Sequence, residues 1–281
     1  MLMGISLFKG KNMNDPFKIL EPTVISVSGG RTSGYLLYRV LEANNGKLPE
    51  DSLAVFANTG KEAEQTLEFV KNCADKWNVE IHWVEYRSNE KKFEIVDFDT
   101  ASRKGEPFEA MIDRYGKLPN TAIRMCTGEL KKHTIHRFVK EKWAALGHKH
   151  GKNTDWMGIR ADEPRRVARF ERHQIPLVVA GITKHDVGKF WANNDFDLEL
   201  PNINGTTNHS NCDLCFLKSE GVLMSLIREN PEKANWWIAQ EEKTGMVFSI
   251  NTPTYKKKKE FAKTQTELFE FGESIPCYCG D

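Results

Sequence analysis

A short β-branched segment that runs directly into a glycine turn and a helix is the feature that most constrains this fold. Residues 23–27 (Thr-Val-Ile-Ser-Val) predict a strand, residues 28–34 (Ser-Gly-Gly-Arg-Thr-Ser-Gly) a turn, and residues 35–41 the apolar face of a helix. Strand, glycine turn and helix form the first unit of an α/β fold. The backbone N–H groups of such a turn lie at the positive end of the helix dipole, so we expect a bound phosphate or sulfate.

The same alternation continues along the chain. Further strands are expected at residues 53–57, 79–84 and 155–159, and helices at 62–77, 108–115 and 127–146, the last with Thr127 as N-cap. Strands that alternate with helices predict a mostly parallel twisted sheet with helices on both faces.

After about residue 170 the pattern loosens, although Thr183 is expected to cap a short helix that ends near Trp191. We therefore divide the chain into three parts. They are an N-terminal leader at 1–22, a nucleotide-binding α/β domain at 23–170, and a smaller, mainly helical C-terminal subdomain with the cysteine motifs at 171–281.

Composition excludes several classes of protein. The 281 residues include 40 Lys and Arg against 39 Asp and Glu, a balance that argues against a globally basic nucleic-acid coat. No apolar run approaches the roughly 20 residues that span a bilayer. The N-terminus also lacks the continuous apolar segment and cleavage site of a secretory signal. We expect a cytoplasmic protein with no membrane partner.

The six cysteines are the second notable feature, and four of them form the pairs Cys212-x-x-Cys215 and Cys277-x-Cys279. In a reducing compartment such clusters bind metal or act in catalysis more often than they form disulfides. Thiolates suit zinc and iron–sulfur clusters. Cys126, Cys212, Cys215 and one tail cysteine fit a [4Fe–4S] cluster, and we favour Cys277 because Pro276 stiffens the chain before it. A Cys₄ zinc site and unligated or redox-active thiols are the alternatives.

Two further expectations concern single cysteines. Cys126 is expected at a helix start, where the dipole lowers the pKa of a thiol. Cys73 falls on the apolar side of the second expected helix, so we expect a buried small apolar residue there.

The Ser-Gly-Gly-x-x-Ser segment resembles the PP-loop of the ATP pyrophosphatases, also called adenine nucleotide α-hydrolases. That superfamily includes phosphoadenosine phosphosulfate (PAPS) reductases, tRNA thiolases and DNA phosphorothioation enzymes. Its usual form is Ser-Gly-Gly-x-Asp-Ser, so Thr32 departs from it at the position linked to magnesium and acid roles. The resemblance implies nucleotide binding by Ser26, Ser28, Gly29, Gly30, Arg31, Thr32 and Ser33, with Arg31 also a candidate catalytic residue.

Three more segments resemble PAPS reductases in the same order. Residues 56–62 resemble the second-strand segment that lies against the adenine, which implicates Asn58 and Thr59. Residues 126–131 resemble the Cys-Thr-x-x-Leu-Lys helix start. Residues 158–166 resemble the Gly-x-Arg segment, whose arginines face the anionic end of the nucleotide; here these are Arg160, Arg165 and Arg166. A guanidinium group can bind a phosphate with two parallel hydrogen bonds. The chain as a whole looks like PAPS reductase-like proteins of phages and prophages.

The resemblance implies an enzyme that binds ATP or PAPS, with Mg²⁺ as a further candidate cofactor. In the first hypothesis it adenylates an acceptor and transfers sulfur with the help of the iron–sulfur cluster. The sulfur donor would be a protein such as a cysteine desulfurase, and the acceptor a nucleic acid or a small metabolite. In the second, a tail thiol, Cys279, reduces PAPS or its analogue APS, and a thioredoxin-like partner resolves the product. The third is a non-catalytic nucleotide- or nucleic-acid-binding module, and a homodimer is compatible with all three.

Overall fold

The computed structural model describes residues 15–147, 154–202 and 207–264, and the tail cysteines Cys277 and Cys279 lie outside these ranges. A five-stranded sheet forms its centre, in the order β4-β3-β2-β1-β5. The strands are β1 Thr23–Val27, β2 Leu53–Asn58, β3 Ile81–Glu85, β4 Glu94–Val96 and β5 Thr154–Met157. Four of them are parallel, and β4 pairs antiparallel with β3. The expected α/β class with a mostly parallel sheet is confirmed.

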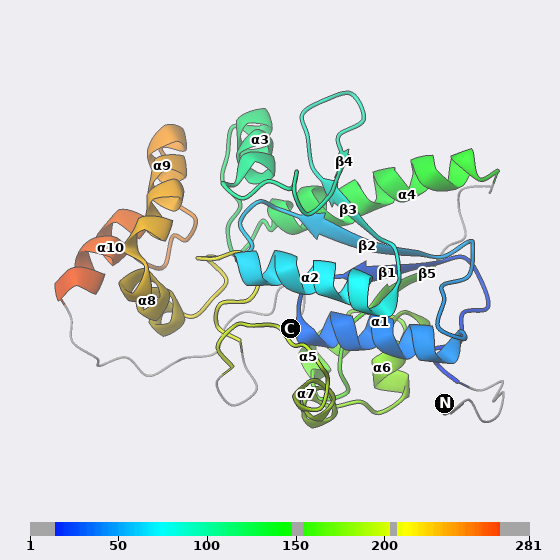
Figure 1. Cartoon of the computed structure of the whole chain (residues 1–281). Helices are drawn as coiled ribbons and strands as arrows, with labels where there is room; N and C mark the ends of the chain where they lie inside the picture. The colour runs from blue at the N-terminus through cyan, green and yellow to red at the C-terminus, as the bar shows by residue number, and fades with distance from the viewer. Residues whose placement is uncertain (1–14, 148–153, 203–206, 265–281) are drawn as a thin grey trace.

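Helices cover both faces of the sheet, as Figure 1 shows. Helices α1, Arg31–Ala43, and α2, Glu64–Trp77, pack on the face that presents Ile25, Val27 and Phe56. Helix α4, Thr134–Ala145, packs on the opposite face, where alternate strand residues such as Val24 and Val55 point. This alternation follows from the two-residue period of a strand. Cys73 is buried in the first of these cores, as expected.

The segment after β5 extends the first core. Its helices are α5 Pro164–Val167, η2 Arg172–Gln174, α6 Pro176–Val179 and α7 Lys184–Ala192. Thr183 and Asp186 form a capping box at the start of α7, which confirms the expected cap. Trp191 and Leu200 pack in the same apolar cluster as α1. The apolar core of the sheet therefore continues to Leu200.

A second apolar cluster is built from the last helices and from α3, Glu106–Tyr115. These helices are α8 Glu220–Glu229, η3 Pro231–Lys233, α9 Ala234–Thr244 and α10 Tyr255–Thr264. Figure 1 shows α8, α9 and α10 grouped at one end of the molecule, beside the sheet. Within the described ranges no helix is both long and apolar enough to cross a membrane.

The helix expected at residues 127–146 differs from the prediction at its start. It opens with a π-helical segment, η1 Thr127–His133, which continues into α4. Thr127 is not the N-cap, because Cys126 before it already has helical backbone angles, φ −60° and ψ −42°. A π-helical turn is unusual and is frequently found at functional sites.

Candidate functional site

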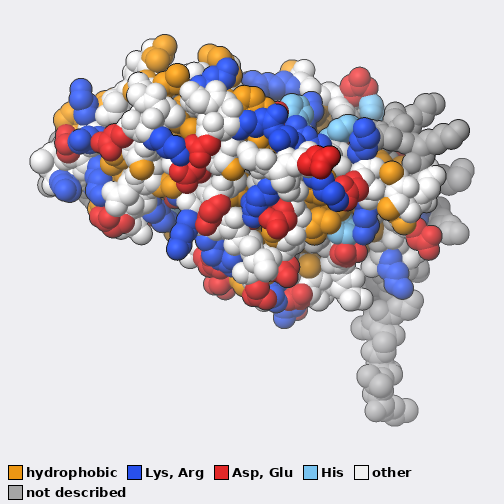
Figure 2. All heavy atoms as spheres, turned by 90° about the horizontal axis from the view of Figure 1, so that it is seen from above, with side chains coloured by type: hydrophobic (Ala, Val, Ile, Leu, Met, Phe, Trp, Pro, Cys, Tyr) orange, Lys and Arg blue, Asp and Glu red, His pale blue; other side chains and the backbone are white. Residues whose placement is uncertain are grey.

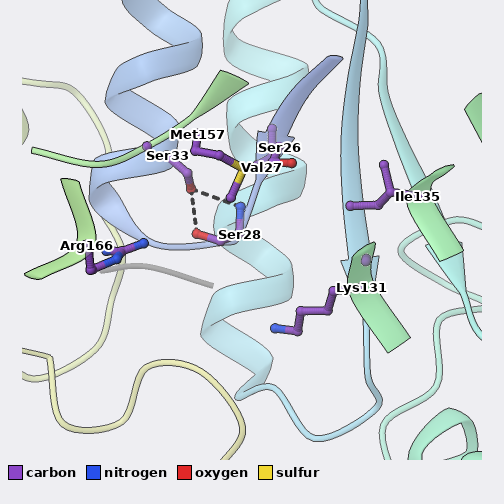
Figure 3. A pocket seen from close by; sticks show the side chains of 10 residues that line it. Ser26, Val27, Ser28, Ser33, Lys131, Ile135, Met157 and Arg166 are labelled. Atoms are coloured by element: carbon purple, nitrogen blue, oxygen red, sulfur yellow. Dashed lines mark hydrogen bonds between the residues drawn. The ribbon is translucent and has the colours of Figure 1, made fainter. Parts of the chain in front are cut away.

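The sheet has a switch point between β1 and β5. The chain steps from β1 to β2 and β3 on one side, whereas β5 pairs with the other side of β1. In open α/β sheets ligands bind beyond the carboxyl ends of the strands at such a point. A small cavity of about 30 Å³ lies here, and Figure 3 shows it. Its lining residues are Ser26, Val27, Ser28, Ser33, Ala57, Lys131, Ile135, Met157, Gly158 and Arg166.

The glycine turn closes on itself through the Ser33 hydroxyl. This oxygen accepts hydrogen bonds from the backbone N–H and the hydroxyl of Ser28, both at 3.0 Å, and donates one to the Gly30 carbonyl at 2.9 Å. Gly29 has φ +81°, and a Cβ there would lie 2.4 Å from Cγ2 of Thr66 on α2. The turn therefore needs glycine at this position, both for its backbone and for its close contact with α2.

Helix α1 begins directly after this turn. Its N-cap, Gly30, has no side chain that could accept a hydrogen bond from the first-turn N–H groups, and the first turn holds no acidic residue. Gly158, just after β5, comes so close that a Cβ there would lie 3.0 Å from the Ser33 Cα. The carboxyl end of β5 and the positive end of α1 thus border one space, which suits an anion.

Two cations face the cavity from different sides. Lys131 reaches it from η1 and Arg166 from α5, as Figure 3 shows, and none of the described lining residues is acidic. Glu163 accepts a hydrogen bond from Arg166 Nη1 at 2.6 Å, and Glu62 lies 3.6 Å from Lys131 Nζ. Both carboxylates contact these cations, and neither is among the described residues that line the cavity. The local charge favours a phosphate or sulfate group.

The other two candidate arginines occupy different places. Arg160 Nη1 donates to the Thr32 hydroxyl at 2.9 Å, and its Nε donates to Asp162 at 3.0 Å. Arg160 therefore ties the segment after β5 to the start of α1. Arg165 is exposed and does not line the cavity. The structure brings Arg160 and Arg166 to the glycine turn and leaves Arg165 on the surface.

Arg31 turns away from the cavity. Its guanidinium holds Asp197 with two bonds, at 2.7 and 2.8 Å, and also donates to the Leu198 carbonyl and the Thr207 hydroxyl. The Arg31 carbonyl accepts a bond from Trp191 Nε1 at 2.8 Å. These contacts fasten α7 and the following segment to the glycine turn, so the side chain has a positioning role in this conformation.

Asn58 is the last residue of β2 and Thr59 follows it, and neither lines the cavity. The Asn58 amide is fully buried and donates to Glu85 at 2.5 Å and to the Ser102 carbonyl at 2.8 Å. Thr59 donates to Glu62, and its hydroxyl lies 3.4 Å from Cys212 Sγ. Near the end of β2, it is Ala57 that lines the cavity.

A larger cavity, of about 220 Å³, adjoins the first. The two share Ser26 and Ile135 in their linings, and the larger one continues between β5 and the helix η1–α4. Its other residues are Lys132, His133, His136, Val139 and Asp155. One elongated ligand could therefore contact both the glycine turn and the groove beside α4.

Three cysteines gather around the second apolar cluster. Cys215 is buried within it, and Cys126 and Cys212 pack against it. Burial raises the pKa of Cys212 well above its ordinary value, and the Glu62 carboxylate adds to this effect. Across the described parts of the chain, no three His, Cys, Asp or Glu residues form a group that could hold a metal ion, and Cys277 lies outside these parts.

The Cys212–Cys215 loop is fastened to the end of β2 by a buried ion pair. Lys61 Nζ lies 3.0 Å from Asp213, and both side chains are about one-tenth exposed. The Asp213 N–H also donates to the Lys61 carbonyl at 2.7 Å, and Trp237 Nε1 donates to the Asp213 carboxylate at 3.0 Å. These bonds and the Thr59–Cys212 contact place the cysteine loop beside residues 59–62, next to the candidate site.

Several residues in or near the candidate site were not identified from the sequence. Lys131 closes the Cys-Thr-x-x-Leu-Lys segment, so the motif itself carried a signal for it. Ile135 and Met157 are ordinary apolar residues of a helix and a strand, and no sequence pattern marks them as lining a cavity. Asp213 stands between the two cysteines, where its partner Lys61 could not be known without the fold.

Comparison with known proteins gives one informative similarity. No protein-family model matches the chain. The chain is similar to the uncharacterized nin region protein ORF290 of Escherichia phage lambda, with 29% identity over 204 residues. The match covers 70% of this chain and 66% of the lambda protein, slightly less than two thirds of its length.

Proposed function

We propose that this protein is a PAPS reductase-like enzyme of the PP-loop ATP pyrophosphatase superfamily. It binds an adenine nucleotide with its phosphates at the glycine turn. The observation that carries the proposal is the cavity at the β1–β5 switch point, which combines the start of α1 with Lys131 and Arg166 and has no acidic residue among its described lining residues. Such a combination favours a multiply charged phosphate ligand.

The reaction we propose is adenylation of an acceptor with release of pyrophosphate, followed by sulfur transfer. In it, an acceptor nucleophile attacks the α-phosphorus of ATP, the bond to the bridging oxygen breaks, and pyrophosphate leaves. Arg166 and Lys131 balance the charge of the phosphates, and Arg160 holds the turn through Thr32. Because Thr32 stands where the usual loop has Asp, the dependence of the reaction on Mg²⁺ is measured separately.

An iron–sulfur cluster at Cys126, Cys212, Cys215 and Cys277 is part of the same proposal. Two observations support it. Cys215 lies in the second apolar cluster with Cys126 and Cys212 packed against it, and Cys212 is in contact with Thr59. When bound, such a cluster could carry sulfur or electrons. Among the described residues, Cys126, Cys212 and Cys215 do not by themselves form a group that could hold a metal ion.

Product analysis separates the proposed reaction from reduction of PAPS. The purified protein is incubated anaerobically with ATP labelled at the α-phosphate, or with PAPS and a thioredoxin-like reductant, each with and without Mg²⁺. The proposal predicts AMP and pyrophosphate from ATP once an acceptor is supplied, or an adenylated acceptor. Sulfite released from PAPS, with no turnover of ATP, would instead establish the reductase. Tight nucleotide binding with neither product across a broad acceptor panel would indicate a binding module.

A further inference from the structure

Two mostly buried ion pairs meet in the turn between β2 and α2, at residues 59–62. Lys61 Nζ lies 3.0 Å from Asp213 in the cysteine loop. Lys131 Nζ lies 3.6 Å from the Glu62 carboxylate. The four side chains are between 2% and 12% exposed, with Glu62 the most buried. Because removal of one partner leaves a buried charge uncompensated, such pairs hold segments together.

Ion pairs on the surface of the protein have a different setting. Figure 2 shows acidic and basic side chains interspersed over the face seen from above. In the pair of Lys91 and Glu141, for example, the two side chains are 61% and 49% exposed. Such pairs contribute little to stability, because water screens the charges and the side chains lose entropy. The buried pairs at residues 59–62 are therefore the stronger candidates for coupling one part of the molecule to another.

The Glu62 carboxylate lies at the centre of this turn. It accepts hydrogen bonds from the backbone N–H groups of Thr59 at 2.9 Å and of Lys61 at 3.2 Å, and from the Thr59 hydroxyl at 2.8 Å. The Thr59 hydroxyl also lies 3.4 Å from Cys212 Sγ. One carboxylate therefore holds the turn that carries Thr59 and Lys61, and through them both contacts to the cysteine loop.

The same carboxylate faces Lys131, which lines the cavity at the glycine turn. Figure 3 shows the Lys131 side chain extending from η1 toward that turn. At 3.6 Å the two groups attract each other by charge, although the distance is too long for a hydrogen bond. A lysine ammonium group has three donors, so it can contact Glu62 and a ligand phosphate together.

We propose that Glu62 is a positioning residue that couples the phosphate cavity to the Cys212–Cys215 loop. It holds Lys131 for the ligand and also holds the turn that fastens the loop, so the loop opens less often when the cavity is occupied. The coupling is reciprocal, since a closed loop favours the bound ligand by the same factor. Taking ATP as the ligand rests on the proposed function, whereas the contacts of Glu62 do not.

Hydrogen–deuterium exchange read by mass spectrometry tests this coupling. The Asp213 N–H donates to the Lys61 carbonyl at 2.7 Å, so exchange in peptides across residues 210–216 reports opening of the loop. Exchange is measured without ligand, with saturating ATP and with saturating inorganic tripolyphosphate. A bound ligand should slow exchange of these peptides in wild type by about fivefold or more, the lower end of the usual coupling between two sites. Helix α8 is the reference for general stabilisation.

Three variants separate coupling from binding. Glu62→Gln keeps the size of the side chain and removes its charge, so it should bind the ligand more weakly and lose most of the slowing even at saturation. Glu64→Gln is the matched control, because Glu64 pairs with Arg103 and the two side chains are 46% and 33% exposed. It should behave as wild type. Thr59→Val removes the hydroxyl between Glu62 and Cys212, and it should also reduce the slowing.

Each outcome decides between the two proposals. Unchanged slowing in Glu62→Gln, or in Thr59→Val if Glu62→Gln does not fold, would overturn the coupling, as would an equal loss in Glu64→Gln. Ligand binding to wild type without slowing beyond that of α8 rejects the coupling and leaves the nucleotide site standing. If tripolyphosphate binds and slows exchange but ATP does not bind, the nucleotide site fails and the coupling stands. If neither ligand binds, both proposals fail.

Discussion

At the scale of single residues, the candidate site depends on close backbone contacts more than on side chains with reactive groups. Gly29 lets the turn approach α2, and Gly158 lets the end of β5 approach α1. A Cβ at either position would lie 3.0 Å or less from a neighbouring atom. Ser33 braces the turn through three hydrogen bonds. The turn is therefore held in its shape before any ligand arrives, which lowers the entropic cost of binding.

Replacement of Gly29 tests this contact. Gly29→Ala should destabilise the protein by more than Gly46→Ala, because both glycines have positive φ but Gly46 has nothing within 4 Å of its added Cβ. The backbone cost should be about 1–2 kcal/mol in each variant, and Gly29→Ala adds the clash with Thr66. Urea denaturation measures both free energies of unfolding. Equal losses would mean that the contact with α2 is easily relieved.

At the scale of elements, the site is assembled from segments far apart in sequence that are tied together by polar bonds. Arg31 holds the segment after α7 through Asp197, and Lys61 holds the cysteine loop through Asp213. Helix α7 itself contacts the glycine turn through Trp191. Local patterns predicted four of the five strands, the turn and the cap of α7. The long-range pairs depend on the packed fold and carry no sequence signal.

The buried pair of Lys61 and Asp213 should be important for stability. Asp213→Ala leaves Lys61 with a buried uncompensated charge, so a loss of about 3–5 kcal/mol is expected. Asp75→Ala is the matched control, because it removes an ion pair with Lys71 in which both side chains are about half exposed. Such a surface pair contributes about 0.5 kcal/mol or less. Similar denaturation midpoints for the two variants would contradict a buried role for Asp213.

The cap of α7 should make stability depend on pH. Hydrogen bonds from the Thr183 side chain and backbone N–H lower the pKa of Asp186 below its usual value. A carboxyl with a lowered pKa in the folded state stabilises the protein above its unfolded pKa, and this contribution is lost as pH falls through the folded value. Asp186→Asn should therefore lower the melting temperature near neutral pH, and its difference from wild type should shrink as the pH falls through the lowered pKa of Asp186. A difference that stays constant across this range would argue against the ionised cap.

At the scale of the whole molecule, two apolar cores are joined by the polar contacts between residues 59–62 and the Cys212–Cys215 loop. The sheet with α1, α2 and α7 forms one, and α3 with α8, α9 and α10 forms the other. The parallel sheet was predictable from its buried strands and glycine turn. Strand β4 was not, because it has three residues and no alternating pattern. The packing of residues up to Leu200 on the first core carries little sequence signal, because the helices after β5 are short and their apolar residues are widely spaced.

The cysteines provide a test of how the second core takes part in function. If they hold a [4Fe–4S] cluster, anaerobically purified protein should contain iron and absorb visible light, and Cys212→Ala should lose both. Cys73→Ala should keep the iron, because Cys73 is buried in the other core. Truncation after Ile275 should lower the iron content if Cys277 is a ligand. About one zinc per chain and no iron would reject the cluster.

Calorimetric titration with ATP is the sharpest test of whether the glycine turn and Arg166 bind the phosphates of an adenine nucleotide. Wild type, Arg166→Met and Arg165→Met are compared, with adenosine as the ligand that lacks phosphates. Arg166 lines the cavity and Arg165 does not. We expect ATP to bind wild type and adenosine to bind much more weakly. Arg166→Met should lose about 1.5–3 kcal/mol of binding free energy, and Arg165→Met clearly less. Equal affinities for ATP in wild type and Arg166→Met, or no binding of ATP to the wild-type protein, would contradict this binding site.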